Sequence, residues 1–124
     1  MASSTFRILV VDDHADSAAL LARLLKIEGH IVQTAGSIAE ATSFCESATF
    51  DLLISDIGLP DGTGYELMAK LHERYGIRGI ALTGRDDVET SAAQGAGFES
   101  YLTKPVNFPD LYAAVARVPC GTSK

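Results

Sequence analysis

The sequence predicts an α/β fold, a (βα)5 unit in which helices cover both faces of a doubly wound, five-stranded parallel sheet. Two observations lead to this fold class. Short apolar runs alternate with longer stretches in which apolar residues recur at helical spacing, as in a parallel sheet that is buried on both faces. The length of 124 residues suits one domain, so we expect a single domain over residues 1–124 with its core at about residues 6–118.

Five short, mainly apolar segments are expected to be strands: residues 6–11, 31–34, 51–55, 79–82 and 99–102. The first helix is expected over residues 15–28, where four leucines share one side of the helix and Gly29 follows the last turn. These leucines are Leu20, Leu21, Leu24 and Leu25.

Capping signals locate the next two helices. Ser37 is followed three residues later by Glu40, and Thr63 by Glu66, so each pair can satisfy two free backbone N–H groups at a helix start. The third helix is expected to bury Leu67, Met68 and Leu71. A fourth helix, with little apolar area, is expected from about residue 86. A fifth, over about residues 107–117, is expected to turn to the core Leu111, Ala114, Val115 and Val118.

Polar residues come at the ends of four expected strands. Asp12 and Asp13 follow the first strand, Asp56 the third, Thr83 the fourth and Lys104 the fifth. In an open parallel sheet, ligands bind beyond the carboxyl ends of the strands, at the point where the strand order reverses. We therefore expect these side chains to converge on one acidic pocket.

Three carboxylates in one pocket repel one another, by roughly 4 kcal/mol for two unit charges about 4 Å apart at an effective dielectric constant near 20. A hard divalent cation offsets this repulsion. Oxygen ligands favour Mg²⁺, and the absence of His and Cys from the candidate set disfavours zinc. Beside such an ion, Asp56 can attack phosphorus, Lys104 adds positive charge, and the Thr83 hydroxyl can bond a phosphoryl oxygen.

These residues resemble the receiver domains of two-component response regulators, with a closer likeness to the receivers attached to hybrid sensor histidine kinases. The similarity runs from residue 8 to about residue 118 and rests on four motifs that are specific only in combination. They are Asp12-Asp13, Asp56 with Pro60 four residues on, Thr83-Gly84, and Lys104-Pro105. The resemblance implies the flavodoxin-like strand order 2-1-3-4-5.

The resemblance makes Asp56 the phosphoacceptor. It assigns the Mg²⁺ site to Asp56, Asp12, Asp13 and the backbone carbonyl of Gly58, with Asp13 as the more direct ligand. The domain would then catalyse only its own phosphorylation and dephosphorylation, so we do not expect an enzyme with a free substrate.

The resemblance also implies a switch. Thr83 and Lys104 would hold the phosphoryl group, the bond before Pro105 would be cis, and Tyr101 would turn inward when Thr83 moves. Two positions, Gly58 and Arg85, depart from common receiver sequences and leave the lifetime of the phosphorylated state open. Gly58 has no side chain to orient a water, whereas Arg85 can cover or pair with the phosphate.

Each candidate also has a purely structural interpretation. Asp12 or Asp13 can cap the following helix, Thr83 can be a strand-terminal hydroxyl, and Tyr101 can be a half-buried strand aromatic. The common placement at strand ends favours the site. His14 is interpreted as a surface histidine rather than as a ligand or an acid–base group.

Composition narrows the location and the partners. A formal charge of −6 disfavours direct nucleic-acid binding, no apolar run approaches the roughly 20 residues that cross a bilayer, and the N-terminus lacks a secretory signal. We therefore expect a cytoplasmic domain without membrane contact. Cys45 and Cys120 match no metal motif and are expected to be free thiols.

The leading hypothesis is a signalling switch that accepts a phosphoryl group on Asp56 from a histidine kinase or a histidine phosphotransfer domain. The donor is expected to dock at Ala15, Ala18, Pro105 and Val106. The fourth helix, fifth strand and fifth helix would form the output face and support a transient homodimer.

Other functions stay open or are disfavoured. The alternative is a receiver-like interaction module that no longer uses phosphorylation. A flavin carrier is disfavoured, because it needs a hydroxyl-rich phosphate loop where this chain has the acids before His14. An aspartate phosphatase is disfavoured, because it needs a second acid at the position that His14 occupies. No effector sequence follows the fifth helix, so we expect a stand-alone regulator or a receiver cut from a longer protein.

Overall fold

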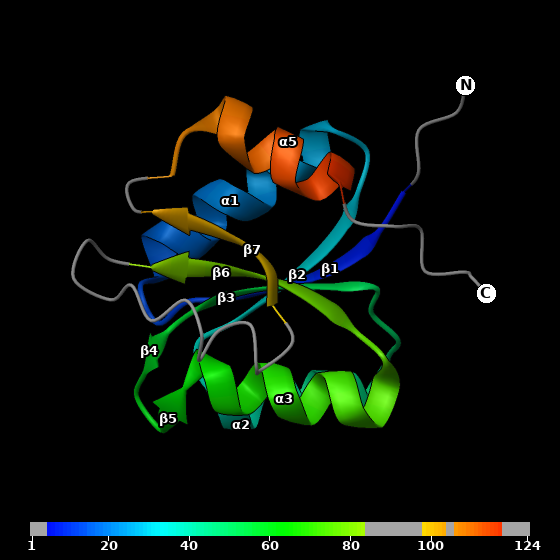
Figure 1. Ribbon diagram of the computed structural model, residues 1–124, viewed down its shortest axis with the longest axis vertical. Coiled ribbons are helices and arrows are strands. Elements are labelled where there is room, and N and C mark those ends of the chain that lie inside the picture. The colour runs from blue at the N-terminus through cyan, green and yellow to red at the C-terminus, as the bar shows by residue number, and fades with distance from the viewer. Residues whose placement is uncertain (1–4, 84–97, 104–105, 118–124) are drawn as a thin grey trace.

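The computed structural model describes residues 5–83, 98–103 and 106–117. Its main sheet has five parallel strands in the order β2-β1-β3-β6-β7, which confirms the predicted fold class and the order 2-1-3-4-5 (Figure 1). Each predicted strand is present, with one residue of difference at one or both ends. The strands are β1 (Arg7–Val11), β2 (Ile31–Ala35), β3 (Leu52–Asp56), β6 (Arg78–Thr83) and β7 (Phe98–Thr103).

Helices of the described part form a layer on each face of this sheet (Figure 1). α1 (Ala15–Ile27) and α5 (Phe108–Arg117) cover one face, and α2 (Ile38–Ser47) and α3 (Gly64–Tyr75) cover the other. The predicted fourth helix lies outside the described residues. In the part of the chain that is described, no helix has the length and apolar character needed to span a bilayer.

Alternate strand residues supply two separate cores. Ile8 and Val10 of β1 pack on the α1–α5 side of the sheet, whereas Leu9 and Val11 pack on the α2–α3 side. Successive side chains of a strand point to opposite faces, so a strand covered by helices on both sides needs apolar residues throughout. The central strand β3 is buried along its whole length, which is why its sequence reads as a continuous run.

The buried stripe of α1 differs from the predicted one. Leu21 and Leu25 are buried together with Ala18 and Ala22, but Leu20 is 51% exposed. Residues spaced by three or four share a helix face, so the stripe through Ala18, Leu21 and Leu25 faces the sheet and Leu20 lies at its edge. The sequence places all four leucines on one side of the helix, but of these only Leu21 and Leu25 are buried.

The capping predictions hold in full for α3 and in half for α2. Thr63 and Glu66 form the reciprocal capping box at the start of α3. At α2 the Ser37 side chain accepts the N–H of Glu40, but the Glu40 carboxylate accepts the N–H of Gly36 rather than that of Ser37. The burial expected for α3 and α5 is confirmed for Leu67, Met68, Leu71, Leu111, Ala114 and Val115. Val118 lies outside the described residues.

A short hairpin follows β3 and joins two helices to it. Its strands, β4 (Gly58–Leu59) and β5 (Gly62–Thr63), pair antiparallel. Between them, the Asp61 carboxylate accepts the N–H groups of Ile38 at 2.9 Å and Ala39 at 3.0 Å, at the start of α2. These two hydrogen bonds lower the pKa of Asp61. The hairpin thereby links the end of β3 to the starts of α2 and α3.

Of the two cysteines, Cys45 lies in the described part, where it is buried and free, as expected. Burial raises the pKa of its thiol, so the neutral form is favoured. Cys120 lies outside the described residues.

Candidate functional site

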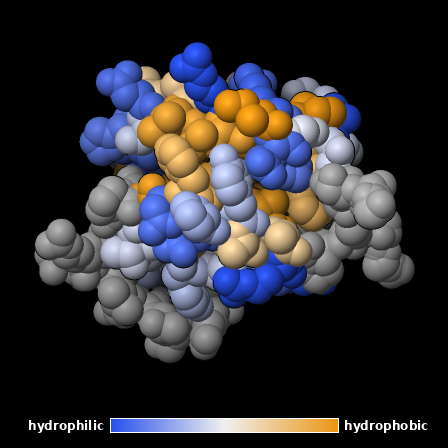
Figure 2. All heavy atoms as spheres, turned by 90° about the horizontal axis from the view of Figure 1, so that it is seen from above, coloured by the Kyte–Doolittle hydropathy of each residue, from blue (hydrophilic) through white to orange (hydrophobic). Residues whose placement is uncertain are grey.

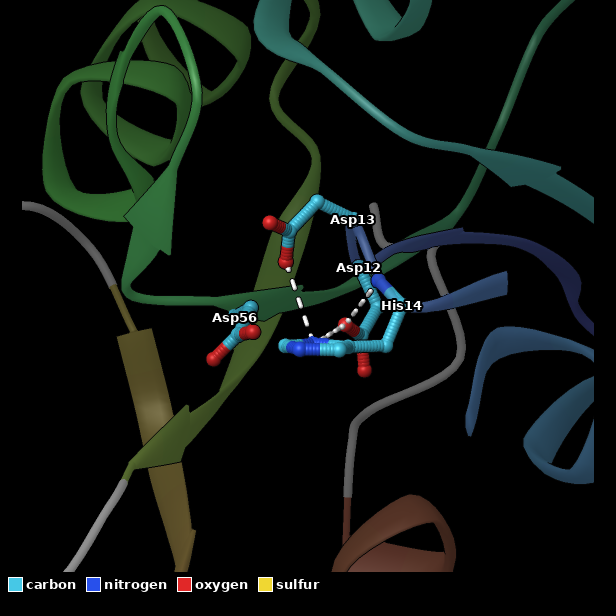
Figure 3. Close-up of side chains that lie close together, drawn as sticks. All are labelled: Asp12, Asp13, His14 and Asp56. Atoms are coloured by element: carbon cyan, nitrogen blue, oxygen red, sulfur yellow. Dashed lines mark hydrogen bonds and ion pairs between the residues drawn. The ribbon is translucent and has the colours of Figure 1, made fainter. Parts of the chain in front are cut away.

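The predicted acids meet at the carboxyl edge of the sheet (Figure 3). Asp12 and Asp13 follow β1 directly, and Asp56 is the last residue of the neighbouring strand β3. One ligand atom from each of these residues and one from His14 all lie within 4.8 Å of one another. Within the described ranges, this is the one cluster of His, Cys, Asp and Glu side chains able to hold a metal ion.

The strand register explains this convergence. β1 and β3 pair Val11 with Ser55, so the next residue of each strand, Asp12 or Asp56, reaches the same level of the sheet. β3 and β6 pair Asp56 with Leu82, and Thr83 follows one residue later. The predicted acids and threonine therefore come from three adjacent strands.

The two innermost carboxylates are fixed by backbone donors. Asp12 and Asp56 are buried. The N–H of His14 donates to Asp12 Oδ1 at 2.9 Å, and the N–H of Ile57 donates to Asp56 Oδ1 at 3.1 Å. Hydrogen bonds from N–H groups to ionised carboxylates are among the stronger ones in proteins, so they orient both acids. The Asp13 side chain is 40% exposed and leaves the pocket accessible from solvent.

The backbone after Asp56 is tightly packed. The Ser55 hydroxyl donates to the Asp56 carbonyl at 2.8 Å, and the N–H of Gly64 donates to the Ile57 carbonyl at 2.7 Å. A Cβ atom at Gly64 would lie within 3.0 Å of the Asp56 carbonyl oxygen, so the start of α3 approaches β3 as closely as only glycine permits. This close approach fixes where β3 ends.

The other predicted site residues differ in burial and in their place relative to Asp56. Thr83 ends β6 and is buried, beside the strand that carries Asp56. Tyr101 on β7 is half-buried and packs against the core on the α2–α3 side. Gly58 is exposed and pairs with Thr63 in the hairpin. The roles predicted for Lys104, Pro105, Gly84 and Arg85 fall outside the described residues.

His14 is exposed, as predicted, but its ring reaches into the acid group. Its side chain is 71% exposed, and Nδ1 lies 3.2 Å from Asp13 Oδ1 and 3.4 Å from Asp12 Oδ1. The ring lies between these two carboxylates and extends toward Asp56 (Figure 3). The prediction separated His14 from the acids, whereas the structure places it among them.

The donor set fits a divalent cation. Carboxylate oxygens from three residues are gathered in one place, two of them buried, and like charges so close together are costly without a counter-charge. Hard oxygen ligands with one side open to water are the usual surroundings of Mg²⁺ in proteins. Asp12, Asp13 and Asp56 supply the carboxylate oxygens that can hold such an ion.

The sequence matches the profile of one protein family over most of its length. The profile described as "Response regulator receiver domain" matches residues 8–116. The chain belongs to the response regulator receiver domain family. Its acidic group is consistent with the metal site of receiver domains, which are signalling modules that partner histidine kinases.

Similar proteins include one much longer than this chain and one of comparable length. The receiver domain is 38% identical over 112 residues to the transcriptional regulatory protein TcrA of Mycobacterium tuberculosis, covering 89% of this chain and 44% of that protein. It is 40% identical to a 14.6 kDa protein of Leptolyngbya boryana, covering 87% of this chain and 86% of that one. The chain thus spans less than half of TcrA and most of the shorter relative.

Solved receiver structures share the fold. A CheY-like receiver domain protein from Methanospirillum hungatei has a TM-score of 0.82 and 37% identity, with 90% of this chain and 91% of that chain covered. A receiver domain protein from Clostridium thermocellum has a TM-score of 0.83 and 29% identity, with 90% and 92% covered.

Sequence reasoning missed three features of the site. The first is the approach of His14 to the acids, for which the adjacency of residues 12–14 is the only sequence signal. The second is the close approach of Gly64 to the backbone of Asp56, which occurs at a φ angle that is not positive. The third is Asp61, whose hydrogen bonds reach residues 22 and 23 positions away. No local pattern encodes a partner that distant.

Proposed function

We propose that this receiver domain accepts a phosphoryl group from a phosphohistidine donor onto Asp56, in a reaction that depends on Mg²⁺, and relays a signal by changing conformation. The observation that carries the proposal is the placement of Asp56 at the end of the central strand, within 4.8 Å of two further acids. The family match to residues 8–116 supports the same assignment.

Asp56 would act as the nucleophile. A carboxylate oxygen forms a bond to phosphorus while the phosphorus–nitrogen bond of phosphohistidine breaks, and the imidazole leaves with the electron pair and takes up a proton. The Ile57 N–H donates to Asp56 Oδ1 and so orients the carboxylate for attack. The product carries more negative charge than the carboxylate it replaces.

The remaining pocket residues would manage that charge. Asp12, Asp13 and the Gly58 carbonyl would hold Mg²⁺, which supplies charge neutralisation for the incoming phosphoryl oxygens. Thr83, at the end of the next strand, would donate its hydroxyl to a phosphoryl oxygen, and Lys104 would pair with another. Tyr101, already half-buried, would follow the movement of Thr83.

A hollow between α1 and α5 supports the proposal that the phosphodonor docks on the α1–α5 side of the sheet. It encloses about 440 Å³ and reaches from Asp12 to apolar residues of both helices. Its lining comprises Asp12, Ser17, Leu20, Leu21, Leu24, Leu82, Val106 and Phe108. Hydrophobic side chains gather on this face (Figure 2). Among the large exposed hydrophobic residues, Leu20 on α1 and Phe108 on α5 line the hollow.

This hollow revises the predicted donor contacts. Ala15 is exposed and Val106 is half-buried, but Ala18 is buried and offers little surface. Leu20 takes its place in the proposal. A histidine kinase or a histidine phosphotransfer domain would present an apolar helix here, beside its phosphohistidine, in the cytoplasm.

Acetyl phosphate and Mg²⁺ test the proposed reaction without a partner protein. Intact-mass measurement should show a gain of one phosphoryl group in the wild-type domain. The gain should be absent after Asp56→Asn, which preserves the shape of the side chain but lacks the nucleophilic carboxylate. Asp51→Asn is the matched control, because Asp51 precedes the same strand at its other end. A gain that persists in Asp56→Asn would reject Asp56 as the phosphoacceptor.

An interaction module that ignores phosphate is the second candidate. It would be favoured by partner binding that Asp56→Asn leaves unchanged and by a domain that does not respond to Mg²⁺. Four further points stay predictions. The full gene would test the extent of the domain over residues 1–124 and the attachment to a hybrid sensor kinase. Solution studies would test the transient homodimer through the fourth helix, fifth strand and fifth helix, and the absence of direct nucleic-acid contact.

A further inference from the structure

We propose that His14 is a nitrogen ligand of the metal site, so that the receiver domain discriminates transition-metal ions from Mg²⁺ by direct imidazole coordination. The inference rests on the proposed function, since it takes the group of Asp12, Asp13 and Asp56 as the ion site. It adds a donor atom of a different chemical kind to that site.

The spacing of the donor atoms carries this inference. Metal–ligand bonds of about 2.1 Å at right angles place neighbouring ligand atoms about 3.0 Å apart, and tetrahedral geometry places them about 3.4 Å apart. His14 Nδ1 lies 3.2 Å from Asp13 Oδ1 and 3.4 Å from Asp12 Oδ1. The distance from the His14 nitrogen to each of the two carboxylate oxygens therefore already matches that between ligands on a shared ion.

The orientation of the ring supports the same role. Its Nδ1 lies between the carboxylates of Asp12 and Asp13, and the ring extends over the pocket toward Asp56 (Figure 3). The backbone of His14 is held by its own N–H, which donates to Asp12 Oδ1 at 2.9 Å. His14 occupies the N-cap position of α1, yet its side chain makes no capping hydrogen bond, and its Nδ1 contacts the carboxylates of Asp12 and Asp13 instead.

A nitrogen ligand changes which ions the site prefers. Imidazole suits Zn²⁺, Ni²⁺, Cu²⁺ and Co²⁺, whereas carboxylate, carbonyl and water oxygens suit Mg²⁺. Mg²⁺ keeps several waters when bound and gains little from imidazole. Loss of His14 should therefore weaken Co²⁺ and Ni²⁺ binding while Mg²⁺ binding stays nearly constant.

Calorimetric titration of tag-free protein with Co²⁺, Ni²⁺ and Mg²⁺ tests this selectivity. In His14→Ala we expect the Kd for Co²⁺ and Ni²⁺ to rise at least about 10-fold, since even outer-shell changes weaken metal binding by about 10–100-fold. The Kd for Mg²⁺ should change by less than about 3-fold. His14→Asn, which keeps a good N-cap residue and offers an oxygen, should show the same loss of selectivity.

A spectroscopic measurement identifies the ligand atom directly. Mn²⁺ bound to the wild-type domain should show nitrogen hyperfine coupling in electron spin-echo experiments, and His14→Ala should lack it. The sequence has three histidines, so His72→Gln serves as the matched control and should keep both the coupling and the selectivity. His72 lies in the last turn of α3, outside the acid group.

A ratio of Co²⁺ to Mg²⁺ affinity that His14→Ala leaves unchanged would overturn the proposal. This outcome includes a variant that binds Mg²⁺ and Co²⁺ more tightly by the same factor, because the imidazole would then act as a competing group and not as a ligand. Phosphorylation by acetyl phosphate separates this inference from the proposed function. A domain that takes the phosphoryl group but shows no nitrogen coupling refutes only the role of His14.

Discussion

Replacing Gly64 with alanine should both destabilise the receiver domain and displace Asp56. A Cβ atom at this position would lie within 3.0 Å of the Asp56 carbonyl oxygen, 3.1 Å from Ser55 Oγ and 3.2 Å from the Asp56 carbonyl carbon. Two of these atoms belong to the backbone of β3, so no side-chain rotation relieves the contact. The start of α3 and the end of β3 must separate by roughly 1 Å to restore ordinary contact near 3.5 Å.

The size of the effect follows from two opposing contributions. Overpacking in a closely packed site costs about 1–3 kcal/mol, and the reduced freedom of the unfolded alanine chain returns about 0.4–1 kcal/mol. The expected net loss in the free energy of unfolding is therefore about 1–2 kcal/mol. For 124 residues, an unfolding entropy of about 2.1 cal/mol/K per residue converts this loss into a fall in Tm of about 4–8 °C.

Circular dichroism during thermal and urea unfolding measures the stability, and intact-mass kinetics with acetyl phosphate measure the reaction. Gly36→Ala is the control, because a Cβ atom there would meet only Glu40 Oε1, at an ordinary 3.6 Å. We expect Gly36→Ala to stay within about 0.5 kcal/mol of the wild type, as surface substitutions usually do. Gly64→Ala should also be phosphorylated more slowly. Equal stability and equal rates for the two variants would refute the packing argument.

Three further predictions concern groups outside the metal site. Asp61→Ala should lower the thermal midpoint of unfolding at neutral pH, because the variant lacks the two hydrogen bonds to the start of α2. These hydrogen bonds depress the pKa of Asp61, so the wild type should lose its higher midpoint as the pH falls from the ordinary aspartate pKa of about 3.9 through the lower folded value. Equal midpoints of the two proteins at pH 7 would contradict this prediction. His30 accepts the Phe6 N–H at Nδ1 over 3.0 Å and stacks on Phe6, and burial lowers its pKa against the opposing effect of Glu28. The unfolded chain therefore binds the proton first, so urea titrations should show stability falling as the pH drops from about 6.5 through the lower folded pKa, and His30→Phe should remove that dependence. Leu20→Ser should slow phosphotransfer from a histidine phosphotransfer domain several-fold and leave acetyl phosphate reactivity and Tm nearly unchanged, because Leu20 is half exposed; an unchanged transfer rate would remove the α1–α5 hollow from the donor surface.

The strands and most helix starts could be predicted because their signals are local. A strand buried on both faces must be apolar throughout, and Thr63 with Glu66 satisfies N–H groups within a single turn. Errors appeared where burial depends on a neighbouring element. Leu20 is a leucine like Leu21, Leu24 and Leu25 and fits the same helical spacing, but the position of α1 on the sheet leaves Leu20 at the edge of the buried face.

The sequence by itself determined the fold class and the identity of the acids, because the edge of a parallel sheet collects whatever follows each strand. Only the tertiary structure decided which atoms meet there. The ring of His14 turns into the acid group, Gly64 touches the backbone of Asp56, and Asp61 holds the start of α2. These contacts depend on side-chain rotamers and on the packing of segments far apart in the chain. Local backbone preferences fix the type of each element, but the distances between elements are set by the two cores that pack around the sheet.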